Sequence, residues 1–123
     1  MKPLPIMERQ NALLITIPKS TKWEEYQKEL DAVKSEEMEM NFKVSSLPKG
    51  VNVGDRCYLV YNGFIVGWMK ISFLGEKEFD CTTTGKKWKG NFVSRTGEFH
   101  ELKKKIPYKG FQGYRYFDYS NID

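Results

Sequence analysis

Hydrophobic and polar residues follow two different periods along the chain, and these periods predict one helix among several strands. Residues 13–17, with the sequence LLITI, form an apolar, β-branched run that stops at Pro18. Such a run predicts a short buried strand. Beyond it, four large apolar residues recur at spacings of three and four, as on one face of a helix: Trp23, Tyr26, Leu30 and Val33.

The start of this helix has a sequence signature of its own. Thr21 is followed three residues later by Glu24, the arrangement of a capping box. In a capping box the Thr hydroxyl accepts a hydrogen bond from a backbone N–H in the first helical turn. We therefore expect a helix of about 12–14 residues with Thr21 as its N-cap, a structural role.

After the helix the period shortens to two. Apolar residues alternate with polar ones over residues 38–44, which predicts an extended segment with one buried face. Asn62-Gly63 separates two apolar runs and is typical of a two-residue hairpin. Further strands are predicted at 57–61, 64–71, 78–83, 90–95, 99–106 and 114–117, with turns at 84–87 and 96–97.

These elements predict an α+β domain. Its expected architecture is a small, mostly antiparallel β-barrel, closed or nearly closed, with one N-terminal flanking helix. The 123 residues are enough for a single domain, and residues 1–10, which include two prolines, are expected to form a flexible N-terminal arm.

Composition excludes several classes of protein. No apolar run is long enough to span a membrane, and an apolar signal segment is missing at the N-terminus, so we expect a cytoplasmic protein. Two cysteines and one histidine argue against a disulfide scaffold and against most zinc sites. We expect no metal and no cofactor, and we expect Cys57 and Cys81 to be buried and inert.

Charge is unevenly distributed along the chain. Residues 1–46 carry seven Lys/Arg and eight Asp/Glu, whereas residues 81–117 carry nine Lys/Arg and only two Glu. Eight of the 18 aromatic residues also lie in 81–117. Basic groups neutralise phosphates and aromatic rings stack on bases, so this segment predicts contact with single-stranded nucleic acid or a nucleotide.

The candidate contacts divide into two groups. Phosphate contacts are predicted from Lys86, Lys87, Lys89, Arg95, Lys103, Lys104 and Lys105, and base contacts from Trp88, Gln112, Tyr114 and Tyr116, with Arg115 beside them. Trp88 is surrounded by lysines in sequence, which favours an exposed ring. Phe111, between glycines at 110 and 113, is instead expected in the core.

One segment resembles a known family. Residues 51–56, VNVGDR, give a Gly-Asp turn that enters the strand YLVY, and residues 63–68 form a hairpin with a second glycine. This order is similar to that of the PUA-like superfamily over residues 41–117, and a free-standing ASCH or EVE type is the nearest comparison. The resemblance implies a five- or six-stranded barrel that binds RNA, modified bases or nucleosides between helix and barrel.

The sequence thus predicts non-catalytic binding of nucleic acid or a modified nucleotide, with DNA, RNA and free nucleotide all open. One alternative is an ASCH-type nucleoside amidohydrolase using Lys19 and Thr21. The Lys-x-x-Thr spacing of those enzymes is missing, because Lys22 stands three residues after Lys19. The other alternative is a protein-binding module of a phage or mobile element, in which the acidic stretch at 20–41 meets a protein partner.

Overall fold

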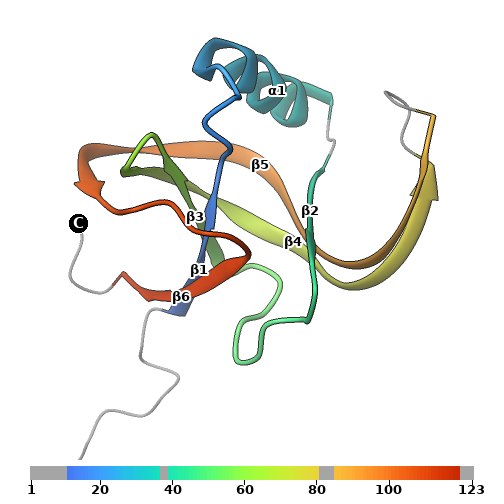
Figure 1. The fold of residues 1–123 in the computed structure, drawn as a ribbon. Coiled ribbons are helices and arrows are strands. Elements are labelled where there is room, and N and C mark those ends of the chain that lie inside the picture. The colour runs from blue at the N-terminus through green and yellow to red at the C-terminus, as the bar shows by residue number, and fades with distance from the viewer. Residues whose placement is uncertain (1–10, 37–38, 81–84, 120–123) are drawn as a thin grey trace, which may run out of the picture.

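A computed structural model describes residues 11–36, 39–80 and 85–119. One helix and six strands follow one another along the chain (Figure 1). Their bounds are β1 Asn11–Thr16, α1 Trp23–Glu36, β2 Met40–Val44, β3 Arg56–Tyr61, β4 Phe64–Asp80, β5 Lys87–Pro107 and β6 Tyr114–Asp118.

The six strands form one curled sheet in the order β2-β5-β4-β3-β1-β6. Only the pair β1 and β3 is parallel, and the other four pairs are antiparallel. The α+β class is therefore confirmed. A closed barrel is not confirmed, because β2 and β6 are the two edges of the sheet and are not paired with each other. The sheet is a curled half-barrel with α1 on one side of it (Figure 1).

β4 and β5 are much longer than the sequence predicts. The expected breaks after residue 71 and at 96–97 are absent, and each strand continues through them. Three irregularities in the β4–β5 register, at Ile65/Gly67, Trp68/Lys70 and Ile71/Phe73, bend the pair instead. The left-handed backbone of Gly97, with φ of 82°, lies within β5 where a turn was expected.

The hairpin between β3 and β4 is confirmed. Asn62 and Gly63 both have positive φ, 51° and 84°. A type I′ turn needs this conformation at both of its central positions.

The sheet has a hydrophobic core on each face. On the face that α1 covers, Tyr26, Leu30 and Val33 pack with alternate residues of β1, β3, β4 and β5, so the predicted apolar helix face is confirmed. On the other face a smaller core around Tyr58 is covered by partly buried side chains between residues 106 and 119, together with Trp68.

The N-terminus of α1 differs from the prediction by one residue. The helix begins at Trp23, and the carbonyl of Lys22 accepts the first helical hydrogen bond, from the amide of Tyr26 at 3.0 Å. Lys22 therefore occupies the cap position. The carbonyl of Thr21 instead accepts a hydrogen bond from the Tyr61 hydroxyl at 2.8 Å, which ties the start of the helix to β3.

Two sequence expectations concern cysteines and membranes. Cys57 is fully buried in β3, as expected, while Cys81 lies outside the described residues. In the described parts of the chain, no helix has both the length and the apolar character that a membrane crossing needs.

Candidate functional site

A half-open cavity of about 480 Å³ lies between α1, the C-terminal end of β1 and the edge strand β2. Most of its wall is apolar and includes Ile17, Val33, Met40 and Phe42. The C-terminal end of β1 extends beyond its pairing with β6, which stops at Ile15. The cavity thus opens where the sheet fails to close into a barrel.

Arg95 of β5 is the main polar group of this cavity. Its side chain lies on the same face as Val93, toward α1, and only 4% of the residue is exposed. One terminal nitrogen, Nη1, is 3.4 Å from the Tyr26 hydroxyl, and the buried Nε has no hydrogen-bond partner. Among the described residues no carboxylate lies within ion-pair distance of Arg95. Within the part of the chain that the structure describes, this buried charge therefore has no counter-ion.

This position corrects the sequence expectation for Arg95. It was predicted to contact phosphate together with the lysines, but it points inward, away from them, because residues 93 and 95 share one face of β5. The spacing of Arg95 two residues after Val93, on the same face of a strand, was the signal for this placement.

Burial also sets the protonation of the groups near Arg95. Desolvation raises the pKa of the Tyr26 hydroxyl, and Arg95 opposes that shift. Desolvation likewise raises the pKa of the Cys57 thiol to about 11, with Arg95 again opposing it. Both groups therefore stay neutral near pH 7, and the expectation that Cys57 is inert is supported.

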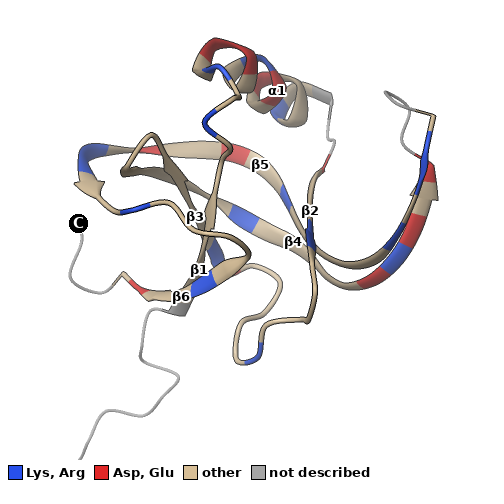
Figure 2. Ribbon diagram, viewed as in Figure 1, with Lys and Arg blue, Asp and Glu red and all other residues tan. Residues whose placement is uncertain are grey.

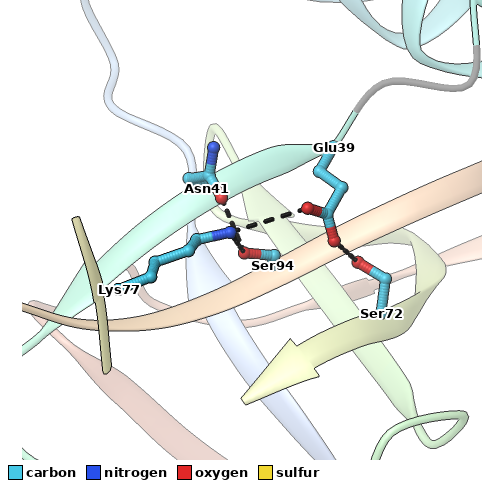
Figure 3. A network of polar contacts seen from close by, with 5 residues as sticks. All are labelled: Glu39, Asn41, Ser72, Lys77 and Ser94. Carbon is cyan, nitrogen blue, oxygen red and sulfur yellow. Dashed lines mark hydrogen bonds and ion pairs between the residues drawn. The ribbon is translucent and has the colours of Figure 1, made fainter. Parts of the chain in front are cut away.

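A polar network ties β2 to the rest of the sheet (Figure 3). Lys77 Nζ lies 2.8 Å from Ser94 Oγ and 3.6 Å from Glu39 Oε1. Ser94 Oγ also donates to Asn41 Oδ1 at 2.6 Å, and Ser72 Oγ donates to Glu39 Oε2 at 2.5 Å. Glu39 and Asn41 are also among the residues that line the cavity. The Asn41 and Ser94 side chains lie on the face of the sheet opposite Met40 and Arg95, so the network holds this segment from the other side.

Lys86, Lys87 and Lys89 lie at the far end of the β4–β5 pair and are exposed. In the sheet register Lys87 is opposite Asp80 and Lys89 is opposite Glu78. Lys87 also forms an ion pair with Glu78 at 2.9 Å. Acidic and basic bands alternate along this arm (Figure 2). The positive charge of Lys87 and Lys89 is thus offset in space by acidic residues of β4.

Trp88 points to the opposite face of the arm from Lys87 and Lys89, because neighbouring residues of a strand alternate between faces. Its ring stacks on Phe79 at a centroid distance of 6.1 Å and contacts Phe92 at 6.3 Å. The residue is 36% exposed. The lysines that surround Trp88 in sequence therefore do not surround its ring.

The remaining predicted contacts lie in two other places. Lys103, Lys104 and Lys105 are exposed near the opposite end of β5 from the arm, and Lys105 pairs with Glu101 at 3.6 Å. The other group lies at or beside the edge strand β6: Gln112, Tyr114, Arg115 and Tyr116. The structure therefore does not bring the predicted contacts into one surface.

Within the β6 group, the side chains have different surroundings. Tyr114 packs partly against the α1-side core, whereas Tyr116 is exposed and its hydroxyl accepts a hydrogen bond from the Lys49 amide at 2.8 Å. The Arg115 guanidinium lies 4.6 Å from the centre of the Phe111 ring. Phe111 itself is partly buried and packs against the smaller core, so its expected place in the core is confirmed only in part.

The residues of the amidohydrolase alternative are not part of the cavity wall. Lys19 is exposed, Thr21 is partly buried, and neither lines the cavity. Within residues 11–36, 39–80 and 85–119, no cluster of three or more His, Cys, Asp or Glu is placed to hold a metal ion.

Sequence reasoning missed most of the cavity. Tyr26, Met40 and Phe42 were assigned to a core face, and they do pack against the core, but they also line an opening. Periodicity identifies a buried face and does not reveal where that face is left uncovered.

Comparisons with known protein families, with curated protein sequences and with solved structures find no match in any of the three.

Proposed function

We propose that this protein is a non-catalytic binding domain that takes a nucleotide, or one nucleotide of a single-stranded nucleic acid, into the cavity beside Arg95. The observation that carries the proposal is the buried guanidinium in the wall of this cavity, which has no counter-ion among the described residues. Buried charges in proteins are ordinarily paired, so an unpaired one facing a cavity favours a ligand that supplies the partner.

The size and lining of the cavity suit such a ligand. Pockets for small molecules are typically about 300–1,000 Å³, mostly apolar, with a few polar groups that fix the orientation of the ligand. Here the volume is about 480 Å³, and the walls are mainly apolar. The polar residues among the lining are Thr16, Tyr26, Glu29, Glu39, Asn41 and Arg95. A base and sugar would lie against the apolar wall and the phosphate would face Arg95.

The lining favours binding over catalysis. The described residues that line the cavity include no Ser, Cys, Lys or His. Its two carboxylates are Glu29 and Glu39, and Glu39 is engaged by Lys77 and Ser72. The resemblance to the PUA-like superfamily, with its ligand site between helix and barrel, supports the same proposal.

Titration of mononucleotides and of short single-stranded oligonucleotides into three variants tests the proposal. Arg95→Met should weaken binding at least tenfold, because it removes the charge and keeps an apolar side chain of similar length. Lys28→Met, which removes an exposed charge of α1 outside the cavity wall, is the control and should change affinity less than twofold.

A third variant separates the cavity from the basic surface. Replacing Lys103, Lys104 and Lys105 together by Met should leave mononucleotide affinity within twofold of the wild type. If this variant loses binding and Arg95→Met does not, the ligand binds at the exposed lysines and the cavity proposal is wrong.

A further inference from the structure

We infer that the cavity selects a ligand with one phosphate group, a phosphomonoester, which Arg95 receives while the acidic rim excludes further phosphates. This inference rests on the proposed function and specifies the ligand class of the same site. The phosphomonoester comes either from a free nucleoside monophosphate or from the phosphorylated end of a strand.

The need for an anion follows from the surroundings of Arg95. The guanidinium is almost fully buried, contacts one neutral hydroxyl at 3.4 Å and leaves Nε without a partner. A neutral ligand would leave this charge uncompensated, whereas a phosphate accepts charge-assisted hydrogen bonds from a guanidinium. Tyr26 stays protonated, so its hydroxyl can donate to the same phosphate.

The network in Figure 3 accounts for Glu39, which lines the cavity and does not pair with Arg95. Glu39 lines the same cavity, yet its two carboxylate oxygens are engaged by Lys77 and by Ser72. The Asn41 and Ser94 side chains of this network lie on the face of the sheet opposite Met40 and Arg95, so the network leaves the charge of Arg95 available for a ligand.

The limit to one phosphate comes from the rim. Glu29 of α1 lines the cavity and is exposed, and α1 carries five acidic residues against two lysines (Figure 2). A second or third phosphate beside Arg95 would come close to the Glu29 carboxylate, the acidic residue of α1 that lines the cavity, where like charges repel. An internal segment of a polyanionic strand meets the same repulsion, which leaves a mononucleotide or a strand end.

A series of ligands with one base, measured without divalent cations, tests the inference. The nucleoside, its monophosphate and its triphosphate are titrated into the wild-type protein. We expect the monophosphate to bind at least tenfold more tightly than the nucleoside and at least fivefold more tightly than the triphosphate. In Arg95→Met the preference for the monophosphate over the nucleoside should fall below twofold.

The rim is tested with Glu29→Gln and its matched control Glu24→Gln, which removes a charge of α1 outside the cavity wall. In Glu29→Gln the ratio of monophosphate affinity to triphosphate affinity should fall at least threefold. In Glu24→Gln this ratio should stay within 1.5-fold of the wild-type value. If this affinity ratio is unchanged in Glu29→Gln, Glu29 does not exclude further phosphates, and this part of the inference is wrong.

The outcomes separate this inference from the proposed function. Equal affinities across the series would overturn the selection for one phosphate and keep nucleotide binding. Absence of binding by every member of the series, and by oligonucleotides, would overturn the proposed function itself. Oligonucleotides with 5′-phosphate, 3′-phosphate or no terminal phosphate identify the source: tighter binding of a phosphorylated end than of the mononucleotide assigns the site to strand ends, and the reverse assigns it to free mononucleotides.

Discussion

Arg95 shows how the position of one residue in a strand decides whether its charge is exposed to water or buried. In the sequence it belongs to a basic segment, but in the sheet it shares a face with Val93 and loses almost all of its contact with water. A guanidinium in that place costs folding free energy, because its charge is desolvated without an ion-pair partner. Such a cost is typical of a residue kept for binding and not for stability.

That cost leads to a prediction about stability. Arg95→Met should leave the free energy of unfolding unchanged or raise it by about 1–2 kcal/mol, because an apolar side chain removes the uncompensated charge. Denaturant melts measure the effect, with Tyr26→Phe as a control that removes only the 3.4 Å contact and should change stability by less than about 1 kcal/mol. A loss above about 2 kcal/mol in Arg95→Met would show that the guanidinium is well paired.

Cys57 gives a prediction about pH. Its pKa is raised by burial to about 11 from a usual value of 9.0, so the folded state retains the thiol proton at a pH where the unfolded chain loses it. The stability that this group contributes is complete below pH 9 and is lost as pH rises toward 11.

The comparison of wild type with Cys57→Ala isolates this effect. The stability advantage of the wild type over the variant should shrink by about 1–2 kcal/mol between pH 8 and pH 10.5, at no more than about 1.4 kcal/mol per pH unit. Chemical melts at the two pH values measure it. A constant difference between the two proteins would mean that the thiol is not buried as described.

At the scale of elements, sequence patterns predicted the helix and most strands correctly where local chemistry decides them. The spacing of Trp23, Tyr26, Leu30 and Val33 gave the helix face, and Asn62-Gly63 gave the hairpin. The sequence did not predict that β4 and β5 are continuous, because a bulge and a turn favour the same residue types. Gly97, in the expected turn at 96–97, has the positive φ that a bulge and a turn can both use. Pairing with the neighbouring strand, which sequence periodicity does not show, decides between them.

The arm formed by the far ends of β4 and β5 carries a testable aromatic cluster. Trp88 lies over Phe79 and Phe92, and Phe92 is fully buried. Trp88→Ala should lower the free energy of unfolding by about 1–2 kcal/mol, and Phe92→Ala by about 3–5 kcal/mol.

Melts of these two variants, together with an oligonucleotide titration, check the cluster. We expect nucleotide affinity to change less than twofold in Trp88→Ala. If Trp88→Ala instead weakens the binding free energy by about 1–3 kcal/mol while the free energy of unfolding is unchanged, Trp88 is a base-stacking residue, as the sequence alone predicts.

At the scale of the whole molecule, the predicted binding residues fall into separate regions. The lysines of the arm face acidic residues of β4, those at 103–105 lie near the other end of β5, and the tyrosines of β6 lie at an edge of the sheet. Neither this separation nor the open edge of β2 follows from residue patterns, because both depend on contacts between segments far apart in sequence. Of the residues in the candidate site, the sequence therefore predicted only Arg95 as a ligand contact. That prediction rested on its place in a basic segment and not on its burial in the cavity wall.

This dispersal predicts a weak dependence of nucleic-acid binding on salt. If a single-stranded oligonucleotide meets only one basic region, about two or three phosphates are neutralised, and log K should fall with log salt at a slope no steeper than about −2. Anisotropy titrations across a range of salt concentrations measure the slope. A slope near −4 would require the separate regions to act together on one strand.

The central claim is that a nucleotide enters the cavity beside Arg95, and nuclear magnetic resonance tests it most directly. A nucleoside monophosphate is titrated into ¹⁵N-labelled protein while the Nε–H signal of Arg95 and the backbone amides are followed. The account predicts a shifted and protected Arg95 Nε–H, with the largest amide shifts at Tyr26, Met40 and Phe42, which line the cavity. Shifts confined to residues 103–105 or to β6, with Arg95 unchanged, would contradict it.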